Sequence, residues 1–275
     1  MVSGRGTRTA MLAALVAGLG GLGLALAVLP FQLDDAFITH RYAANVLAGH
    51  GPTFEPAAAP AEGFSSPLWL ALDLAAGAFF GVEAIPRAAS VAGCLALLLS
   101  MAALAAVTDQ TRRPAPWIAC LLLAISGPVA YHTATGLETL AFVALTLVAV
   151  AGLTGRVPLW LGAAAAMGGP LCRPEGMWIP VALAAALTVV RERDVIRRGA
   201  ILATAAAGSA LALLVVRRAV FEEWLPNTYF AKPPDRLEGL RYLLDGLLDP
   251  WALPLLALAV IGAAVGGKWP RAWLA

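Results

Sequence analysis

The chain has 275 residues, of which 60% are hydrophobic and only 13% are charged. A soluble globular domain averages about 45–50% apolar and about 25% charged residues, so this composition excludes an ordinary soluble protein. The formal net charge of +2 is too small to indicate a nucleic-acid partner. Ala, Leu and Val run together in blocks close to the length of about 17–25 residues that a membrane-spanning helix requires. We therefore expect an all-α integral membrane protein that is surrounded by membrane lipid.

The first apolar segment, residues 10–29, follows an N-terminal stretch that carries Arg5 and Arg8. Two interpretations are open, because Ala25-Leu26-Ala27 resembles the small-x-small cleavage site of a signal peptide. The segment is longer than the apolar region of about 7–15 residues that is usual in signal peptides. We expect a retained first transmembrane helix with its N-terminus in the cytoplasm, which places the following loop outside.

Two adjacent carboxylates, Asp34 and Asp35, follow this segment at the membrane surface, where a charge is costly and therefore indicates a function. Residues 34–48 have the pattern of a short amphipathic helix that Asp34 can cap and that Gly49 ends. We expect its apolar side to consist of Phe37, Ile38, Tyr42, Val46 and Leu47. A loop rich in Pro and Ala then leads to Glu62-Gly63-Phe64-Ser65-Ser66-Pro67-Leu68-Trp69.

Residues 67–80 are apolar but short for a membrane span. A helix of this length extends about 21 Å, which is less than the bilayer core of about 30 Å. Asp73 lies in its middle, where a charge facing lipid would cost about 2.5–3.5 kcal/mol. The segment either crosses the membrane or lies along its surface and returns the chain to the same side.

The charges of the loops decide between these alternatives. Further apolar segments cover residues 88–107, 116–131, 138–153, 157–171, 175–190, 197–216 and 250–266. The basic connectors contain Arg112-Arg113, Arg156, residues 191–198 and residues 268–271. Because basic loops stay in the cytoplasm, this set is consistent only if residues 67–80 do not cross. We therefore predict about eight transmembrane helices and an interfacial helix at 67–80, with three exceptions to the charge rule. The exceptions are Arg217, Arg218 and Lys232.

This topology brings to one face of the membrane polar residues that were not used to derive it. They are Asp34, Asp35, Glu62, His132, Glu138, Arg173, Glu175, Asn227 and Lys232. The carboxylate pair suits either a general base or the ligands of a divalent cation such as Mg²⁺ or Mn²⁺, and a simple helix cap is the third interpretation. Arg173 suits a lipid phosphate. The aromatic, amide and cationic residues of 225–232 suit a sugar.

Five motifs, in chain order, resemble those of the GT-C superfamily of integral-membrane glycosyltransferases. They are Asp34-Asp35-Ala36-Phe37-Ile38 with Arg41-Tyr42 and Asn45, residues 62–69, Gly136-Leu137-Glu138-Thr139, Arg173-Pro174-Glu175-Gly176 and residues 225–232. Within the superfamily, the chain looks most similar to cell-wall arabinofuranosyltransferases that use decaprenyl-phosphate arabinose. Ser65-Ser66 stands where that family has a Thr-Asn or Thr-Ser pair, which leaves the identity of the sugar open.

The resemblance implies an inverting glycosyltransferase that moves a sugar from a polyprenyl-phosphate donor to a cell-envelope glycan or lipid acceptor. It also implies that Asp34 or Asp35 is the catalytic base, with a slight preference for Asp34. The residues expected to bind the donor phosphate are Arg173, Lys232 and Arg218. The residues expected to bind the substrates are Arg41, Glu62, Glu138, Glu175, Asn227 and Tyr229.

We expect the chain, residues 1–275, to form one GT-C-like multi-pass domain in the plasma membrane with its site on the periplasmic or extracellular side. The first outer loop covers residues 30–87 and a later one covers residues 217–249, while the soluble C-terminal domain usual in the family is absent. The alternatives are a transporter or flippase of a lipid-linked substrate and a non-catalytic truncated homologue. Transporters typically show repeated halves and charges near the middle of the bilayer, and we find neither in the sequence.

Overall fold

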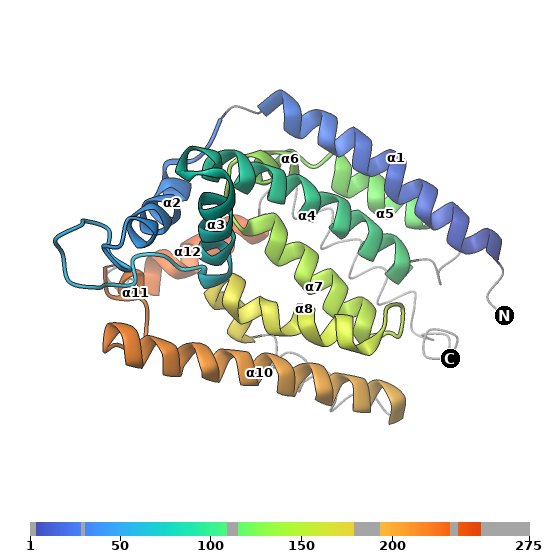
Figure 1. Cartoon of the computed structure of the whole chain (residues 1–275). Coiled ribbons are helices and arrows are strands. Elements are labelled where there is room, and N and C mark those ends of the chain that lie inside the picture. Colours follow the sequence, from blue (N-terminus) through green and yellow to red (C-terminus); the bar gives the residue numbers. More distant parts are fainter. Residues whose placement is uncertain (1–3, 29–30, 109–114, 179–192, 232–235, 249–275) are drawn as a thin grey trace. The chain divides into compact units, whose positions relative to one another are not determined.

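The computed structural model describes residues 4–28, 31–108, 115–178, 193–231 and 236–248, and the chain divides into two compact units, Met1–Thr228 and Tyr229–Ala275. Every regular element among the described residues is a helix (Figure 1). The α-helices are α1 (Gly4–Val28), α2 (Asp34–Leu47), α3 (Pro67–Phe80), α4 (Ile85–Thr108), α5 (Ala115–Ala124), α6 (Gly127–Ala134), α7 (Thr139–Leu153), α8 (Leu159–Cys172), α10 (Arg193–Phe221), α11 (Asn227–Ala231) and α12 (Arg236–Leu248). Short 3-10 helices cover Val82–Ala84 and Pro174–Trp178. The prediction of an all-α fold is confirmed for this part of the chain.

Two helices in the described ranges are long and apolar enough to cross a membrane: Val82–Thr108, with 27 residues, and Arg193–Phe221, with 29 residues. A third candidate is the pair Pro116–Ala124 and Gly127–Ala134, whose axes are bent by 62°. These helices agree with a membrane protein, but the prediction of eight spans is not supported. The physical reason is length, because α7 and α8 have only 15 and 14 residues. At about 1.5 Å per residue, such helices extend about 21–23 Å across a core of about 30 Å.

The break between α5 and α6 corrects the prediction of one continuous span over residues 116–131. α6 carries Pro128 in its first turn. Proline lacks a backbone N–H and its ring clashes with the carbonyl group four residues earlier, so a helix does not continue through this position undisturbed. Most of the predicted segment 175–190 and all of 250–266 lie outside the described residues.

The helices of the first unit pack side by side in the order α1, α4, α7, α8 and α10 (Figure 1). Leu97 and Met101 of α4 are fully buried in the cluster that joins α4 to α1 and α5, and Leu202 of α10 is fully buried against α8. Glycines allow the closest approach, because a Cβ atom built on Gly152 of α7 would lie 2.6 Å from the Cα atom of Gly162 of α8. Small residues are enriched at helix contacts in membranes for this reason.

The ribbon of α3 runs crosswise to α4 and α8 at one end of these helices (Figure 1), and α3 contacts both of them as well as α2. The hydroxyl group of Ser66 accepts a hydrogen bond from the backbone N–H of Trp69 at 3.2 Å, and Pro67 starts the helix. Gly81 ends it with a φ angle of 88°. Serine, proline and glycine are the residues that favour these three positions, so the sequence predicts the bounds of this helix correctly.

The start of α2 corrects the prediction that Asp34 caps the helix. The N-cap is Leu33, and no side chain forms a capping hydrogen bond there. Instead, the backbone N–H of Leu33 donates to the carbonyl oxygen of Thr135 at 3.2 Å, which ties α2 to the loop before α7. The predicted apolar side is also partly wrong, because Phe37 is 50% exposed while Tyr42 is buried. The buried residues of α2 are Ala36, His40, Tyr42, Ala43 and Asn45.

Candidate active site

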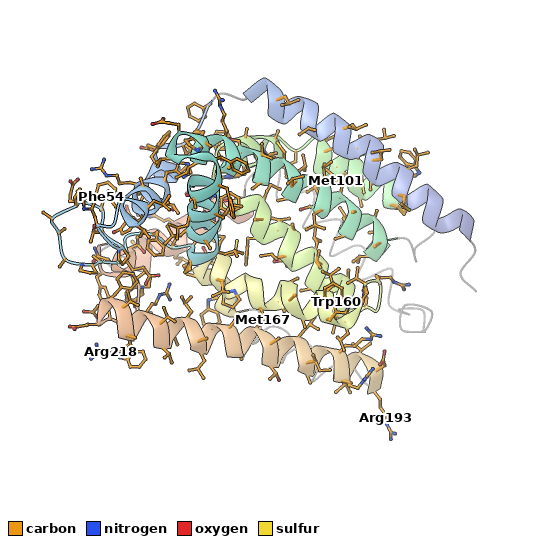
Figure 2. All side chains as sticks on the ribbon, in the orientation of Figure 1. Phe54, Met101, Trp160, Met167, Arg193 and Arg218 are labelled. Carbon is orange, nitrogen blue, oxygen red and sulfur yellow. The ribbon has the colours of Figure 1, made fainter. Side chains whose placement is uncertain are left out.

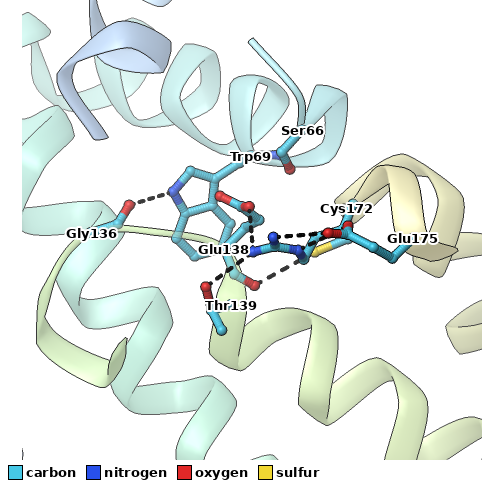
Figure 3. A network of polar contacts seen from close by, with 8 residues as sticks. Ser66, Trp69, Gly136, Glu138, Thr139, Cys172 and Glu175 are labelled. Carbon is cyan, nitrogen blue, oxygen red and sulfur yellow. Dashed lines mark hydrogen bonds and ion pairs between the residues drawn. The ribbon is translucent and has the colours of Figure 1, made fainter. Parts of the chain in front are cut away.

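Hydrogen bonds join all five motifs of the sequence at the end of the first unit where α3 lies. The pairs are Gly63 to Tyr42, Trp69 to Gly136, Arg173 to Glu138 and Asn227 to Glu62. The indole N–H of Trp69, for example, donates to the carbonyl oxygen of Gly136 at 2.7 Å and is buried (Figure 3). Motifs that lie far apart along the chain therefore form one connected structure, and this structure is the candidate active site.

Arg173, which follows α8, is the centre of a network of charge-assisted hydrogen bonds (Figure 3). Its Nη1 atom donates to Glu138 Oε1 at 3.1 Å and to Thr139 Oγ1 at 3.2 Å. Its Nε and Nη2 atoms donate to the two carboxylate oxygens of Glu175 at 3.2 and 3.3 Å. The Glu138 side chain is only 10% exposed, whereas that of Glu175 is 59% exposed. The guanidinium group is thus held by one buried and one exposed carboxylate.

The pKa values in this network follow from burial and charge. Burial raises the pKa of Glu138, Arg173 opposes that change, and the negative charges of Glu175 and Asp35 add to it. Burial also acts to raise the pKa of Glu175, but its hydrogen bonds with Arg173 outweigh this effect and lower the pKa. The backbone hydrogen bond from Leu33 to Thr135 also ties the start of α2, which carries the carboxylate pair, to the loop that leads to Glu138.

Asp34 and Asp35 are exposed in the first turn of α2. Asp34 Oδ1 accepts a hydrogen bond from the backbone N–H of Asp35 at 3.0 Å. Neither carboxylate forms an ion pair with a described residue. Because their lone pairs are mostly not engaged, both side chains are available to accept a proton from a bound molecule.

Around Arg173 and the aspartate pair, acidic side chains outnumber basic ones. Asp34, Asp35, Glu138 and Glu175 carry four carboxylates, and Arg173 supplies one guanidinium group that Glu138 and Glu175 already bind. Four of the five guanidinium N–H groups of Arg173 donate to Glu138, Thr139 and Glu175, which leaves one Nη2 N–H without a described partner. Within the described ranges, no group of three or more His, Cys, Asp or Glu residues could hold a metal ion. The residues present therefore do not form a site ready for the divalent cation that the carboxylate pair suggested.

Glu62, which was predicted to contact substrate, instead forms a buried ion pair. Its Oε2 atom accepts a hydrogen bond from Arg217 Nε at 2.7 Å, and the two side chains are 3% and 2% exposed. The backbone carbonyl of Glu62 accepts from the N–H of Asn227 at 2.9 Å. Burial raises the pKa of Glu62, and the hydrogen bond and charge of Arg217 oppose this change. The pair joins the loop before α3 to the end of α10.

A second buried pair, His40 and Asp73, joins α2 to α3. His40 Nδ1 lies 2.7 Å from Asp73 Oδ2, and the side chains are 6% and 0% exposed. Asp73 thus faces a histidine instead of lipid, which offsets part of the cost that its place in an apolar segment implied. Neither His40 nor Arg217 was proposed as a site residue from the sequence. Two features of the sequence could have indicated these buried pairs. Asp73 is an acid within an apolar segment, and Arg217 is an arginine on the side opposite to the basic loops.

The remaining candidates lie outside the Arg173 network. Arg41 is exposed and holds the loop before α3, with its Nε atom donating to the carbonyl oxygen of Phe54 at 3.2 Å. Arg218 is exposed and its Nη1 atom donates to the carbonyl oxygen of Glu222 at 2.6 Å. The side chains of Asn227 and Tyr229 are exposed, and Tyr229 belongs to the second unit. Lys232 lies outside the described residues.

Comparisons of the chain with protein-family models, with curated proteins and with solved structures find no significant match.

Proposed function

We propose that this protein is a membrane glycosyltransferase that uses a polyprenyl-phosphate sugar as donor and a glycan or lipid hydroxyl group as acceptor. The observation that carries the proposal is the position of Asp34 and Asp35. These two exposed carboxylates have no ion-pair partners among the described residues, and the backbone hydrogen bond from Leu33 to Thr135 ties their helix to the loop that leads to Glu138. Two helices of the described residues are long and apolar enough to cross a membrane, where the lipid part of such a donor would lie.

In the proposed reaction, one aspartate takes the proton of the acceptor hydroxyl group. The hydroxyl oxygen then attacks the anomeric carbon of the sugar, and the bond between that carbon and the phosphate oxygen breaks. Polyprenyl phosphate leaves with the electron pair of this bond, and a single displacement inverts the anomeric configuration. An exposed carboxylate suits this role because it can reach a substrate hydroxyl group. We derive no step through a metal ion.

The buried Glu138 and the exposed Glu175 hold Arg173 in one orientation, so we assign Arg173 a positioning role toward sugar hydroxyl groups and Glu138. Charge-assisted hydrogen bonds that the guanidinium group donates to two carboxylates restrict its plane more than a single contact would. Thr139 accepts a further hydrogen bond from the same Nη1 atom. The guanidinium group is thus held rigidly beside the flexible lipid-linked substrate. Holding reacting groups in a fixed geometry lowers the entropic cost of the reaction.

The arrangement of the helices supports a site on the outer face. The end of α7 and the start of α10 lie away from α3. At this end, Arg198 Nη1 donates to the carbonyl oxygen of Gly152 at 3.3 Å. Arg193 and Arg218 lie at opposite ends of α10 (Figure 2). The loop between α7 and α8 lies at the end of these helices away from α3 (Figure 1), and Arg198 lies beside Gly155 of this loop. We assign this end to the cytoplasm by the positive-inside rule. The crosswise course of α3 supports its assignment as an interfacial helix.

The charges of the described candidate spans do not favour a transporter. Val82–Thr108 has Glu83 and Arg87 near its start, and the charged residues of Arg193–Phe221 lie within about two turns of its ends. Coupling charges in transporters lie near the middle of the bilayer. A charge pattern confined to helix ends is more typical of a reaction at the membrane surface.

A transfer assay with the purified full chain tests the proposal. The donors are synthetic prenyl-phosphate sugars that differ in the sugar, and the acceptors are short soluble glycans. Asp34→Asn and Asp35→Asn are compared with Glu83→Gln, which changes an exposed acid outside the network. We expect one of the two aspartate variants to lose about 10²–10⁴-fold in rate, the range for a lost general base. Full activity of both variants would refute the base assignment, and a chelator arm tests the need for a cation.

A further inference from the structure

An open groove of about 820 Å³ lies beside the carboxylate pair. It is formed by the end of α1, the segment that leads into α2 and the first part of α4 (Figure 1). Its apolar lining includes Leu26, Phe31, Phe37 and Val91, each of which is at least half exposed. The groove is therefore accessible from its surroundings, and its walls suit a hydrocarbon chain.

The polar residues of the groove gather toward the start of α4. Gln32 Nε2 donates to the carbonyl oxygen of Pro86 at 2.5 Å and to Ser90 Oγ at 3.0 Å. These bonds fix the segment before Asp34 against α4. Arg87, in the first turn of α4, is exposed and lines the groove, and no described residue forms an ion pair with it. Farther along α4, the lining changes to Val91 and Cys94.

We propose that this groove binds the polyprenyl phosphate part of the donor, with the phosphate at Arg87 and the hydrocarbon chain along α1 and α4. This inference rests on the proposed function. An available guanidinium group above an apolar groove matches a molecule with an anionic head and a hydrocarbon tail. Arg173, the cation favoured by the sequence, is already bound by Glu138 and Glu175. Arg87 can bind a phosphate without giving up an ion pair with a described residue.

The groove and the carboxylate pair belong to neighbouring residues of the chain, because Gln32 and Phe37 of the groove lining flank Asp34 and Asp35 in sequence. Gln32 donates to the carbonyl oxygen of Pro86 in α4 and lies only two residues before Asp34. A phosphate at Arg87 therefore sets the attached sugar close to the carboxylate pair, with the chain pointing away along α4. An arginine at the end of a membrane helix can also serve as a simple anchor at the lipid surface. The experiment must separate these two roles.

Photo-crosslinking to the purified full chain in detergent tests the site. One probe is a prenyl phosphate with a benzophenone in its chain, and the matched probe is the same prenyl alcohol without phosphate. We expect crosslinks on α1 and α4 near Leu26, Val91 and Cys94. Arg87→Gln should weaken the binding of the phosphate probe by about tenfold or more, as for the loss of a charged hydrogen bond, and leave the alcohol probe unchanged.

Two further variants test the apolar wall. Val91→Trp fills the groove and should abolish crosslinking of both probes, whereas Leu95→Trp adds the same bulk to α4 at an exposed residue outside the groove lining and should leave both unchanged. Arg193→Gln, at the other end of the helices, is the control for a general loss of positive charge (Figure 2). Competition with vesicles of phosphatidylglycerol and with inorganic phosphate distinguishes a prenyl phosphate from a lipid headgroup and a free anion.

The outcomes separate this inference from the proposed function. Normal crosslinking by Arg87→Gln and Val91→Trp, together with normal sugar transfer, would overturn the groove assignment and leave the function standing. Crosslinking in the groove without sugar transfer to any acceptor would support the groove and contradict the function. Equal competition by phosphatidylglycerol and prenyl phosphate would overturn the assignment to the donor, because the groove would then bind any anionic lipid.

Discussion

The buried pair of Glu62 and Arg217 makes a sharp prediction about stability. Glu62→Ala would leave the Arg217 guanidinium group 2% exposed and without a carboxylate, while its Nη2 atom already lacks a hydrogen-bond partner among the described residues. Arginine does not lose its proton in proteins, so the charge cannot be relieved by titration. Removing one partner of a buried ion pair costs about 3–5 kcal/mol. At about 2–4 °C per kcal/mol, the melting temperature should fall by about 6–20 °C.

The assay is thermal unfolding of the purified protein in detergent, followed by tryptophan fluorescence. The matched control is Glu55→Ala, which removes one partner of an exposed pair with Arg41, whose atoms are 3.6 Å apart. Exposed pairs contribute about 0–1 kcal/mol, so this variant should change the melting temperature little. The double variant Glu62→Ala/Arg217→Met removes both buried charges and should be more stable than Glu62→Ala alone. Equal melting temperatures for the Glu62→Ala and Glu55→Ala variants would refute the argument.

Three further predictions concern other contacts of the first unit. Burial raises the pKa of Asp73, so the folded state binds its proton more tightly than the unfolded chain, and stability should fall as pH rises from the ordinary pKa of 3.8 through the raised value. Asp73→Asn should make the melting temperature depend less on pH over that range. Glu138→Gln should weaken the hold on Arg173 and lower the rate of sugar transfer more than the affinity for acceptor, which separate measurements of kcat and KM would show. Gly152→Leu should destabilise the contact between α7 and α8 by at least about 1–3 kcal/mol, whereas Gly208→Ala on α10, which has open space around it, should be neutral or stabilising in the same melting assay.

The local features of the fold were predictable because they depend on residues that are close in sequence. The helix over residues 67–80 has serine, proline and glycine at its ends, and the structure gives it the same bounds. The break at Pro128 was missed although the residue is visible in the sequence, because hydropathy averages over a window and a single proline barely changes it. Eight spans are not supported among the described residues, because composition reports how apolar a segment is, whereas crossing also depends on the length of unbroken helix.

The pairing of charges was not predictable, because it depends on contacts between distant parts of the chain. Glu62 and Arg217 are 155 positions apart, and no local pattern links them. The sequence nevertheless marked Arg217 and Asp73 as anomalies: one violates the charge rule for loops, and the other is an acid in an apolar segment. In a membrane protein, where an unpaired buried charge is expensive, such anomalies predict that a partner exists even when they do not identify it.

The pairing also ranks the candidate residues in a way that the motifs alone could not. The sequence places Glu62, Glu138 and the aspartate pair at one face of the membrane, and only the resemblance to a known family makes the aspartates the expected base. In the structure, Glu62 is bound to Arg217 and buried, and Glu138 is bound to Arg173 and mostly buried. A general base needs a lone pair that is free and accessible to the substrate. Asp34 and Asp35 are exposed and have no ion-pair partner among the described residues, which is why the proposed reaction assigns the base to one of them and not to Glu62 or Glu138.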